Sequence, residues 1–287
     1  MIISVASGKG GTGKTTVAVN FALSIKSVQF LDCDVEEPNA HIFLKPRIQT
    51  KIYISLPVPE IIESKCTYCG KCKEVCEFNA IVVLPPTDNS KGQVMIFDHL
   101  CHNCGACTLF CPEKAIKEKD KIVGVVESGN SGNIEFIQGK MNIGEVSTPT
   151  IINSVKKYLN RRKIVIIDSP PGVSCPFLAS VKGSDFSLLV TEPTPFGLHD
   201  LIKAVKAIRE MKIPFGVVIN RFNIGDKEVE KYCEAENIPV LMKIPYNEEF
   251  ARLYSQGIPY VKHFENLKEE YQLLHKNIEK ILCGDRK

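Results

Sequence analysis

A glycine-rich loop near the N-terminus has the residue types and spacing that bind phosphate groups. Between a short apolar run and an apolar helical stretch lies Gly8-Lys9-Gly10-Gly11-Thr12-Gly13-Lys14-Thr15-Thr16. Glycines let successive backbone N–H groups turn toward phosphate oxygens, and the start of the following helix adds a favourable dipole. In this pattern Lys14 reaches the β- and γ-phosphates and the Thr15 hydroxyl binds Mg²⁺. The loop therefore predicts a site for a nucleoside triphosphate with Mg²⁺.

Eight of the twelve cysteines form two motifs with the spacing of iron–sulfur ligands. The motifs consist of Cys66, Cys69, Cys72 and Cys76, and of Cys101, Cys104, Cys107 and Cys111. In two-cluster bacterial ferredoxins with this spacing, the fourth cysteine of each motif ligates the other cluster. One 4Fe-4S cubane is therefore assigned to Cys66, Cys69, Cys72 and Cys111, and the second to Cys101, Cys104, Cys107 and Cys76. Zinc is the competing interpretation, but zinc favours two C-x-x-C pairs separated by a longer loop.

The rest of the chain alternates short apolar runs with helical stretches, which predicts the elements that hold these loops. The predicted strands are Ile2–Ala6, Val28–Leu31, Ile164–Ile167, Phe186–Val190, Phe215–Ile219 and Val240–Ile244. The predicted helices are Thr15–Ile25, Leu198–Met211 and Asp226–Glu236. This alternation is typical of an α/β fold with a doubly wound, mainly parallel sheet of the P-loop NTPase kind.

The cysteine-rich segment interrupts this alternation, which indicates a small inserted domain. We predict that residues 1–56 and 121–287 form one P-loop domain. Residues 57–120 are predicted to form a bacterial-ferredoxin-like α+β module, and Pro57 and Pro59 stand at its start. Two more strands are predicted directly after the insertion, at Lys121–Glu127 and Asn133–Ile137.

Composition and charge exclude several classes of protein. The 287 residues are 44% hydrophobic and 24% charged, with a net charge of +3, which excludes disordered chains and argues against a nucleic-acid partner. The chain starts without a basic and apolar leader and has no run of 18 apolar residues, so we expect a cytoplasmic protein without membrane attachment. Reduced cytosolic thiols favour metal ligation over disulfides. The amphipathic stretch Phe264–Leu282 is predicted to be a helix packed on the domain.

The phosphate loop contains an additional lysine, Lys9, and reads K-G-G-T-G-K-T from there. In this it resembles the deviant loop of the MinD/ParA/Mrp and nitrogenase-iron-protein class of P-loop ATPases. The resemblance implies that Lys9 reaches the partner's phosphates in an ATP-dependent homodimer. Asp32-Cys33-Asp34 resembles the switch I segment of that class, which implies that Asp34 activates the attacking water and Asp32 supports the magnesium shell. Asp168-Ser169-Pro170-Pro171-Gly172 resembles its Walker B and switch II segments, with Asp168 holding Mg²⁺ through water and Gly172 facing the γ-phosphate.

Two later segments resemble the adenine-binding edge of the same class. These are Asn220-Arg221 and Pro245-Tyr246-Asn247, each directly after a predicted strand. The resemblance implies that the Asn220 amide binds the adenine ring and that Pro245 lies beside it. Arg221 and Tyr246 are weaker candidates, because such residues at strand ends often serve packing alone.

The whole chain resembles MinD-superfamily ATPases with an inserted ferredoxin domain. This resemblance implies an ATP-hydrolysing switch with slow turnover, in which the nucleotide state is coupled to electron transfer through two 4Fe-4S clusters to a protein redox partner. Two alternatives stay open, a metallocluster assembly or carrier ATPase and a regulatory or positioning ATPase with structural clusters. Cys175 corresponds in place to a bridging-cluster ligand of the nitrogenase iron protein, but the second cysteine that such a cluster needs is missing.

Overall fold

The computed structural model describes residues 1–284, which divide into two compact units. The inserted unit comprises Tyr53–Val125 and Met141–Thr148, and the other described residues form the larger unit. The inserted unit is wider than the predicted segment 57–120 and includes a returning segment that was not predicted. Two long strands explain the difference, because each has residues in both units and no linker marks the boundary.

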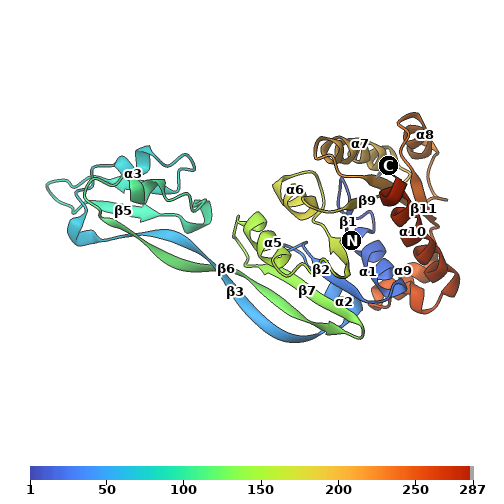
Figure 1. The fold of residues 1–287 in the computed structure, drawn as a ribbon. Helices are drawn as coiled ribbons and strands as arrows, with labels where there is room; N and C mark the ends of the chain where they lie inside the picture. Colours follow the sequence, from blue (N-terminus) through green and yellow to red (C-terminus); the bar gives the residue numbers. More distant parts are fainter. Residues whose placement is uncertain (285–287) are drawn as a thin grey trace. The chain divides into compact units, whose positions relative to one another are not determined.

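One nine-stranded sheet has the order β11-β10-β9-β1-β8-β2-β7-β6-β3 (Figure 1). The strands are β1 (Ile2–Ala6), β2 (Val28–Asp32), β3 (Arg47–Ile61), β6 (Ile116–Ser131), β7 (Ile134–Met141), β8 (Ile164–Asp168), β9 (Phe186–Thr191), β10 (Phe215–Asn220) and β11 (Val240–Ile244). Every neighbouring pair from β11 to β7 is parallel, which confirms the mainly parallel α/β class. Four predicted strands run one residue further, onto Asp32, Asp168, Thr191 and Asn220.

Helices cover both faces of the parallel strands. They are α1 (Lys14–Ser24), α2 (Ala40–Leu44), α5 (Thr148–Lys156), α6 (Cys175–Val181), α7 (Pro195–Glu210), α8 (Glu228–Ala235), α9 (Glu248–Ser255) and α10 (Glu265–Gly284). Alternate residues of β9 show the two layers, since Leu188 packs in one core with α1 and α10 while Leu189 packs in the other with α7. Tyr271 and Ile278 of α10 are fully buried, so the C-terminal helix packs on the domain as predicted.

Strand β3 was not predicted, because Pro57 and Pro59 interrupt its pattern. Proline cannot donate a ladder hydrogen bond, so it is tolerated where one side of a strand has no partner. β3 is the last strand in the sheet order, and two prolines two positions apart direct their nitrogens to the same side of the strand. The edge position therefore accommodates both residues. The two strands predicted after the insertion are parts of β6 and β7.

The inserted unit is built from two similar halves around the two cysteine motifs. Each half has a short 3₁₀ turn, a cysteine loop and a four-residue helix, which are η1 (Glu63–Lys65) and α3 (Lys71–Glu74), and η2 (Asp98–Leu100) and α4 (Ala106–Leu109). The loops have the same backbone shape, with positive φ at Tyr68 and Gly70 in one and at Asn103 and Gly105 in the other. An antiparallel pair, β4 (Ile81–Leu84) and β5 (Gln93–Ile96), completes the unit.

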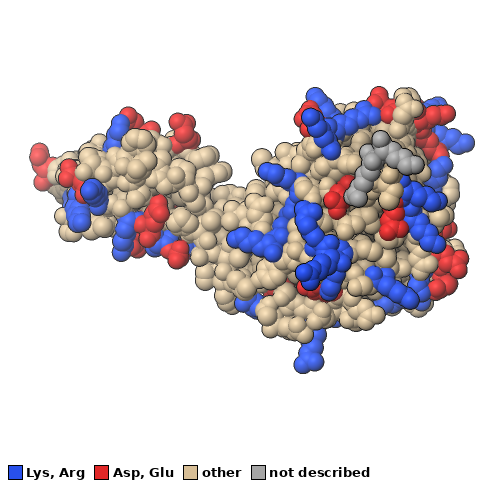
Figure 2. Space-filling model, in the orientation of Figure 1, with Lys and Arg blue, Asp and Glu red and all other residues tan. Residues whose placement is uncertain are grey.

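Little hydrocarbon is buried inside this unit. Its hydrophobic cluster consists of Ile81, Cys107 and Ile116, with partly buried cysteines and aliphatic residues around them. Val58, Ala80, Ala115 and Val123 are the other buried apolar residues of this unit. Its surface charges lie beside opposite charges, as in the pairs Lys117–Glu60 at 2.7 Å and Lys71–Glu74 at 2.8 Å. Figure 2 shows blue and red side chains interspersed on the drawn face of this unit. A core with so many thiols would gain much of its cohesion from a group that the thiols bind.

Gly139 of β7 leaves the space into which side chains of α5 pack. A β-carbon at this position would lie 2.6 Å from Cγ1 of Val35 and 2.9 Å from the Cγ2 atoms of Ile151 and Val155. All three neighbours are fully buried, so they have little freedom to move away. We therefore expect Gly139→Ala to cost about 1–3 kcal/mol through overpacking. Denaturant midpoints would measure the loss, and Gly284→Ala, where the β-carbon meets no atom within 4 Å, is the matched control.

Candidate functional site

A cavity of about 480 Å³ lies in the larger unit where the parallel strands end. Its wall comes from the loops after β1, β2, β8, β10 and β11, the edge where ligands bind in open α/β sheets. Among the predicted nucleotide residues, the cavity is lined by Lys9, Gly10, Gly11, Gly13, Lys14, Thr15, Thr16, Asp34, Asn220 and Pro245. The fold thus brings together residues that lie more than two hundred positions apart in the sequence.

Two residues of the predicted phosphate loop do not line the cavity. A β-carbon on Gly8 would lie 2.0 Å from the backbone oxygen of Asp200, so Gly8 allows close packing against α7. Thr12 is 2% exposed, and its backbone oxygen accepts a 2.8 Å hydrogen bond from Nδ2 of Asn220. Both residues shape the loop from behind. Sequence could not separate them from the cavity-lining residues, because only the tertiary structure places α7 and β10 against the loop.

Lys14 forms the charged centre of the cavity. Its Nζ donates a 2.6 Å hydrogen bond to Oδ1 of Asp168 and lies 3.6 Å from Oδ2 of Asp34. Burial by itself would lower the pKa of Lys14, but the two carboxylates together raise it. Asp168 is fully buried, and its Oδ2 has no hydrogen-bond partner among residues 1–284. An unpartnered carboxylate oxygen on the residue that holds Lys14 suits a water of a hydrated Mg²⁺.

The two aspartates of the predicted switch I segment occupy different environments. Asp32 is fully buried, and its carboxylate accepts hydrogen bonds from the backbone N–H groups of Asp34 and Ala40, at 3.2 and 3.1 Å. It shapes the segment and does not line the cavity. Asp34 does line it, and burial, opposed in part by Lys14, raises the pKa of Asp34 to about 6. A carboxyl group with a pKa in this range can accept a proton near neutral pH.

Lys9 is held by Glu192, a residue that the sequence analysis did not select. Nζ of Lys9 lies 3.6 Å from Oε2 of Glu192, and the other oxygen of the same carboxylate pairs with Arg221. Glu192 follows the last residue of β9, and its side chain is 11% exposed. An acidic residue just after a buried strand was the only signal that could have identified it.

The segments after β10 and β11 line the cavity with apolar and amide groups. Asn220 and Pro245 lie there together with Tyr246 and Phe250. One hydrogen of the Asn220 amide is used by Thr12, and the second stays available for a ligand. The backbone N–H of Tyr246 donates a 2.6 Å hydrogen bond to Oδ1 of Asn223, which fixes the loop after β11. A planar base with polar edges fits this combination of aromatic walls and amide donors.

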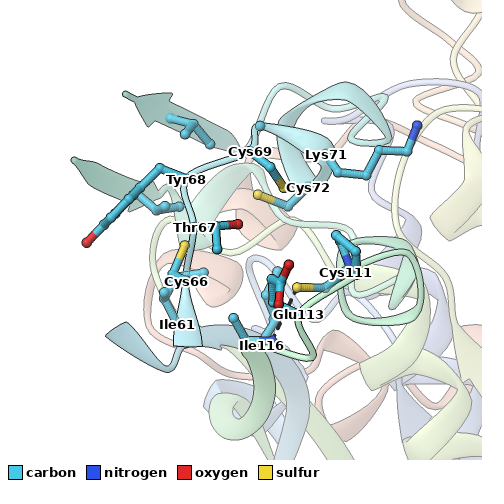
Figure 3. Close-up of a pocket in the computed structure, with 15 residues that line it drawn as sticks. Ile61, Cys66, Thr67, Tyr68, Cys69, Lys71, Cys72, Cys111, Glu113 and Ile116 are labelled. Carbon is cyan, nitrogen blue, oxygen red and sulfur yellow. Dashed lines mark hydrogen bonds between the residues drawn. The ribbon is translucent and has the colours of Figure 1, made fainter. Parts of the chain in front are cut away.

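Two further cavities lie inside the inserted unit, and each is lined by four cysteines. The first contains Cys66, Cys69 and Cys72 of one motif and Cys111 of the other. Figure 3 shows these side chains around one common space. The second cavity is lined by Cys76, Cys101, Cys104 and Cys107. The fourth cysteine of each motif thus lies with the first three of the other, as the predicted ligand sets require.

Each cysteine cavity offers the four thiols that one 4Fe-4S cubane would need. No three His, Cys, Asp or Glu side chains within the described part of the chain converge tightly enough to hold one ion. In a cubane each cysteine binds a different iron, so the sulfurs surround a volume and do not meet at a point. Backbone N–H groups of Ala80 and Ala115 donate to the sulfurs of Cys76 and Cys111, at 3.3 and 3.2 Å. Such donors stabilise thiolate charge on a cluster.

The other four cysteines lie outside both cavities. Cys33 and Cys233 are buried, whereas Cys175 and Cys283 are exposed. Cys175 begins α6, three residues after Gly172, the last residue of the predicted switch II segment. These thiols supply matched controls for experiments on the eight cysteines of the cavities.

Comparison with known proteins identifies the family. The family model for the CobQ/CobB/MinD/ParA nucleotide binding domain matches residues 3–260. The chain belongs to this family. Membership in the CobQ/CobB/MinD/ParA family confirms the resemblance to MinD and ParA that the phosphate loop and switch segments indicated. The inserted ferredoxin-like module stays a prediction.

Individual relatives of this CobQ/CobB/MinD/ParA-family protein add detail. An uncharacterized protein of Methanocaldococcus jannaschii is 32% identical over 92% of both chains. An iron-sulfur cluster carrier protein of Pyrococcus horikoshii is 25% identical, over 90% of this chain and 78% of that protein. The septum site-determining protein MinD of P. horikoshii, solved with Mg-ADP, has a TM-score of 0.59 at 20% identity and covers 98% of this chain and 96% of its own. The last similarity shows a common fold.

No helix in residues 1–284 is both long and apolar enough to cross a membrane.

Proposed function

We propose that this protein is an ATP-hydrolysing, nucleotide-dependent dimer that carries two 4Fe-4S clusters, and that its nucleotide state controls electron transfer through them. The observation that most strongly supports this proposal is that one chain combines a cavity at the phosphate loop with two cavities lined by four cysteines each. Membership in a nucleotide-binding family supports the first half of the proposal. The Mg-ADP bound to the P. horikoshii MinD supports an adenine nucleotide with Mg²⁺.

At the phosphate end of the cavity, charged side chains divide the work of hydrolysis. Lys14 exchanges its contact with Asp168 for the β- and γ-phosphates, while Thr15 and Asp168 hold Mg²⁺. Asp34 lines the cavity, and in this proposal it orients the attacking water and accepts its proton. Gly172, with φ of 88°, has its N–H 3.0 Å from the Ser7 carbonyl oxygen, and a change in this contact would direct that N–H to the γ-phosphate.

Lys9 carries the dimer part of the proposal. In the single chain it lines the cavity and is paired with Glu192, with 29% of its side chain exposed. A separation of 3.6 Å at a partly exposed position makes a weak ion pair, which a phosphate can replace. We therefore assign Lys9 to the phosphates of a second subunit.

Each cubane has four cysteines from its own cavity as ligands, and bound clusters supply one-electron redox chemistry. The protein contributes thiolates, the N–H donors of Ala80 and Ala115, and glycines that keep the loops tight. Both motifs have complete ligand sets, which suits retention of clusters during electron transfer.

A cluster carrier is the second candidate function, and the name of the P. horikoshii relative favours it. A carrier must release its cluster to an acceptor, whereas an electron carrier retains it. Incubation with an apo-ferredoxin and a chelator distinguishes the two. Transfer of iron to the acceptor within minutes would support the carrier function.

Anaerobic purification with iron and sulfide analysis tests the main proposal. We expect about eight irons per chain, and an EPR signal after reduction that changes when ATP and Mg²⁺ are added. Redox titration with and without ATP measures the same coupling as a shift in midpoint potential. Colourless protein with little iron, or a potential that nucleotide does not move, would refute it.

The pKa of Asp34 predicts how hydrolysis depends on pH. Because Asp34 must be ionised to accept a proton, its pKa of about 6 means that the active form is lost as the pH falls through 6. We expect kcat/KM for ATP to fall about tenfold for each pH unit below this value and to be level above pH 7. Steady-state kinetics between pH 5 and 8 would measure the profile. A flat profile across pH 6 would contradict the assignment of Asp34 as the base.

A further inference from the structure

Helix α5 connects the end of the inserted unit to both switch segments of the nucleotide site. The returning segment Met141–Thr148 belongs to the inserted unit, and α5 begins at Thr148. The rest of α5 belongs to the larger unit. A change in the position of this helix therefore acts directly, through the chain, on the inserted unit.

Several contacts join the returning segment to the rest of the inserted unit, including hydrogen bonds from Asn142 to the backbone oxygens of Ile122 and Val123, at 2.8 and 2.9 Å. Lys121 and Glu145 form an ion pair of 2.8 Å. The Ser147 hydroxyl donates a 3.4 Å hydrogen bond to Oδ1 of Asn103. Asn103 lies between Cys101 and Cys104 in the second cysteine loop. The segment before α5 thus contacts a loop that lines the second cysteine cavity.

On the switch I side, α5 packs against the residue that follows Asp34. Cγ1 of Val35 and the Cγ2 atoms of Ile151 and Val155 meet over Gly139, where no side chain separates them. Val35 is fully buried and is adjacent in sequence to the proposed base. A displacement of switch I therefore presses on α5, because packed interiors transmit small shifts instead of absorbing them.

On the switch II side, the last residue of α5 holds the helix that follows Gly172. Nζ of Lys156 donates hydrogen bonds to three backbone oxygens at the end of α6, those of Ala179 at 2.8 Å, Ser180 at 2.8 Å and Lys182 at 2.5 Å. The last carbonyl groups of a helix lack intrahelical partners and carry the negative end of its dipole. One ammonium group with three donors satisfies three of them.

We propose that Lys156 is a positioning residue that fixes α6 to α5, and that α5 thereby transmits changes in switch II to the segment 141–148 of the inserted unit. This rests on the proposed nucleotide-dependent function and identifies the route by which the cavity acts on the cysteine unit. The coupling needs no contact between the two units besides the continuous chain. It uses the hydrogen bonds from Lys156 to the carbonyl groups at the end of α6, and the packing of α5.

Lys156→Met tests the proposal, because methionine keeps the aliphatic length and removes the charge and the donors. Lys157→Met is the matched control, since Lys157 is the next residue of the chain and its side chain is exposed. Hydrogen exchange of peptides covering 141–148 is measured with and without a non-hydrolysable ATP analogue and Mg²⁺. We expect the analogue to change exchange in wild type and Lys157→Met by about tenfold, and by less than about twofold in Lys156→Met.

Steady-state kinetics separates positioning from general destabilisation. Lys156→Met should lower kcat by about tenfold to a hundredfold with KM for ATP within about twofold, because only the alignment of switch II changes. Lys156→Arg, which keeps charge and donors, should restore at least half of the exchange response and also serves if Lys156→Met does not fold. An unresponsive segment 141–148 in wild type, or a full response in Lys156→Met, would overturn the proposal. Failure of the cluster function is read separately, from iron content and EPR.

Discussion

Replacing Cys111 by alanine is expected to remove the same cluster that Cys66→Ala removes, and to leave about four of eight irons per chain. The two residues lie far apart in sequence but line one cavity. Cys76→Ala should instead match Cys101→Ala, because both residues line the second cavity. Iron analysis gives the amount lost, and EPR of the reduced variants shows which cluster remains.

Comparison of the EPR spectra of these variants shows whether the fourth cysteine of each motif binds the cluster of the other motif or that of its own. If each motif held its own cluster, Cys111→Ala would match Cys101→Ala and not Cys66→Ala. Cys175→Ala and Cys283→Ala are the controls, because these exposed thiols lie outside both cavities, and they should keep all iron. Loss of iron in Cys175→Ala would point to a further cluster that uses this residue.

Replacing Asp34 by asparagine should lower kcat for ATP hydrolysis by about 10²–10⁴-fold, the usual effect of removing a general base. Asparagine keeps the size of the side chain, so binding of ATP should change by less than about threefold. Single-turnover phosphate release measures the first quantity, and displacement of a fluorescent nucleotide measures the second. Asp88→Asn, at an exposed position of the inserted unit, makes the same chemical change as a control.

Lys14→Ala should behave differently from Asp34→Asn. Lys14 touches the phosphates in the proposed site, so its loss weakens nucleotide binding as well as hydrolysis. It also leaves the buried carboxylate of Asp168 without its 2.6 Å partner.

Hydrolysis at the wild-type rate in Asp34→Asn would contradict the assignment of Asp34, because it would show that the water is activated by another group.

The local sequence predicted the parallel strands and the residues that could bind ligands. Six apolar runs became parallel strands within one residue of the predicted ends, because a strand buried on both faces needs an uninterrupted apolar run. The phosphate loop and the two cysteine motifs could also be recognised in the sequence. Both are local patterns, in which the types and spacing of residues close together in the chain predict a ligand.

Contacts between residues far apart in the sequence could not be predicted from such local patterns. Glu192 beside Lys9, Gly8 against α7 and Asn220 behind Thr12 depend on which loops the sheet order places together. Strand β3 was hidden by two prolines that only an edge position permits.

The sequence by itself therefore predicted which ligands this protein binds, since the spacings of glycine, lysine and cysteine are local patterns. Only the tertiary structure decided how the sites are supported and connected. It placed Glu192 beside Lys9, and Lys156 at the end of α6. The physical reason is that such contacts depend on the packing of whole elements, which no short stretch of residues encodes.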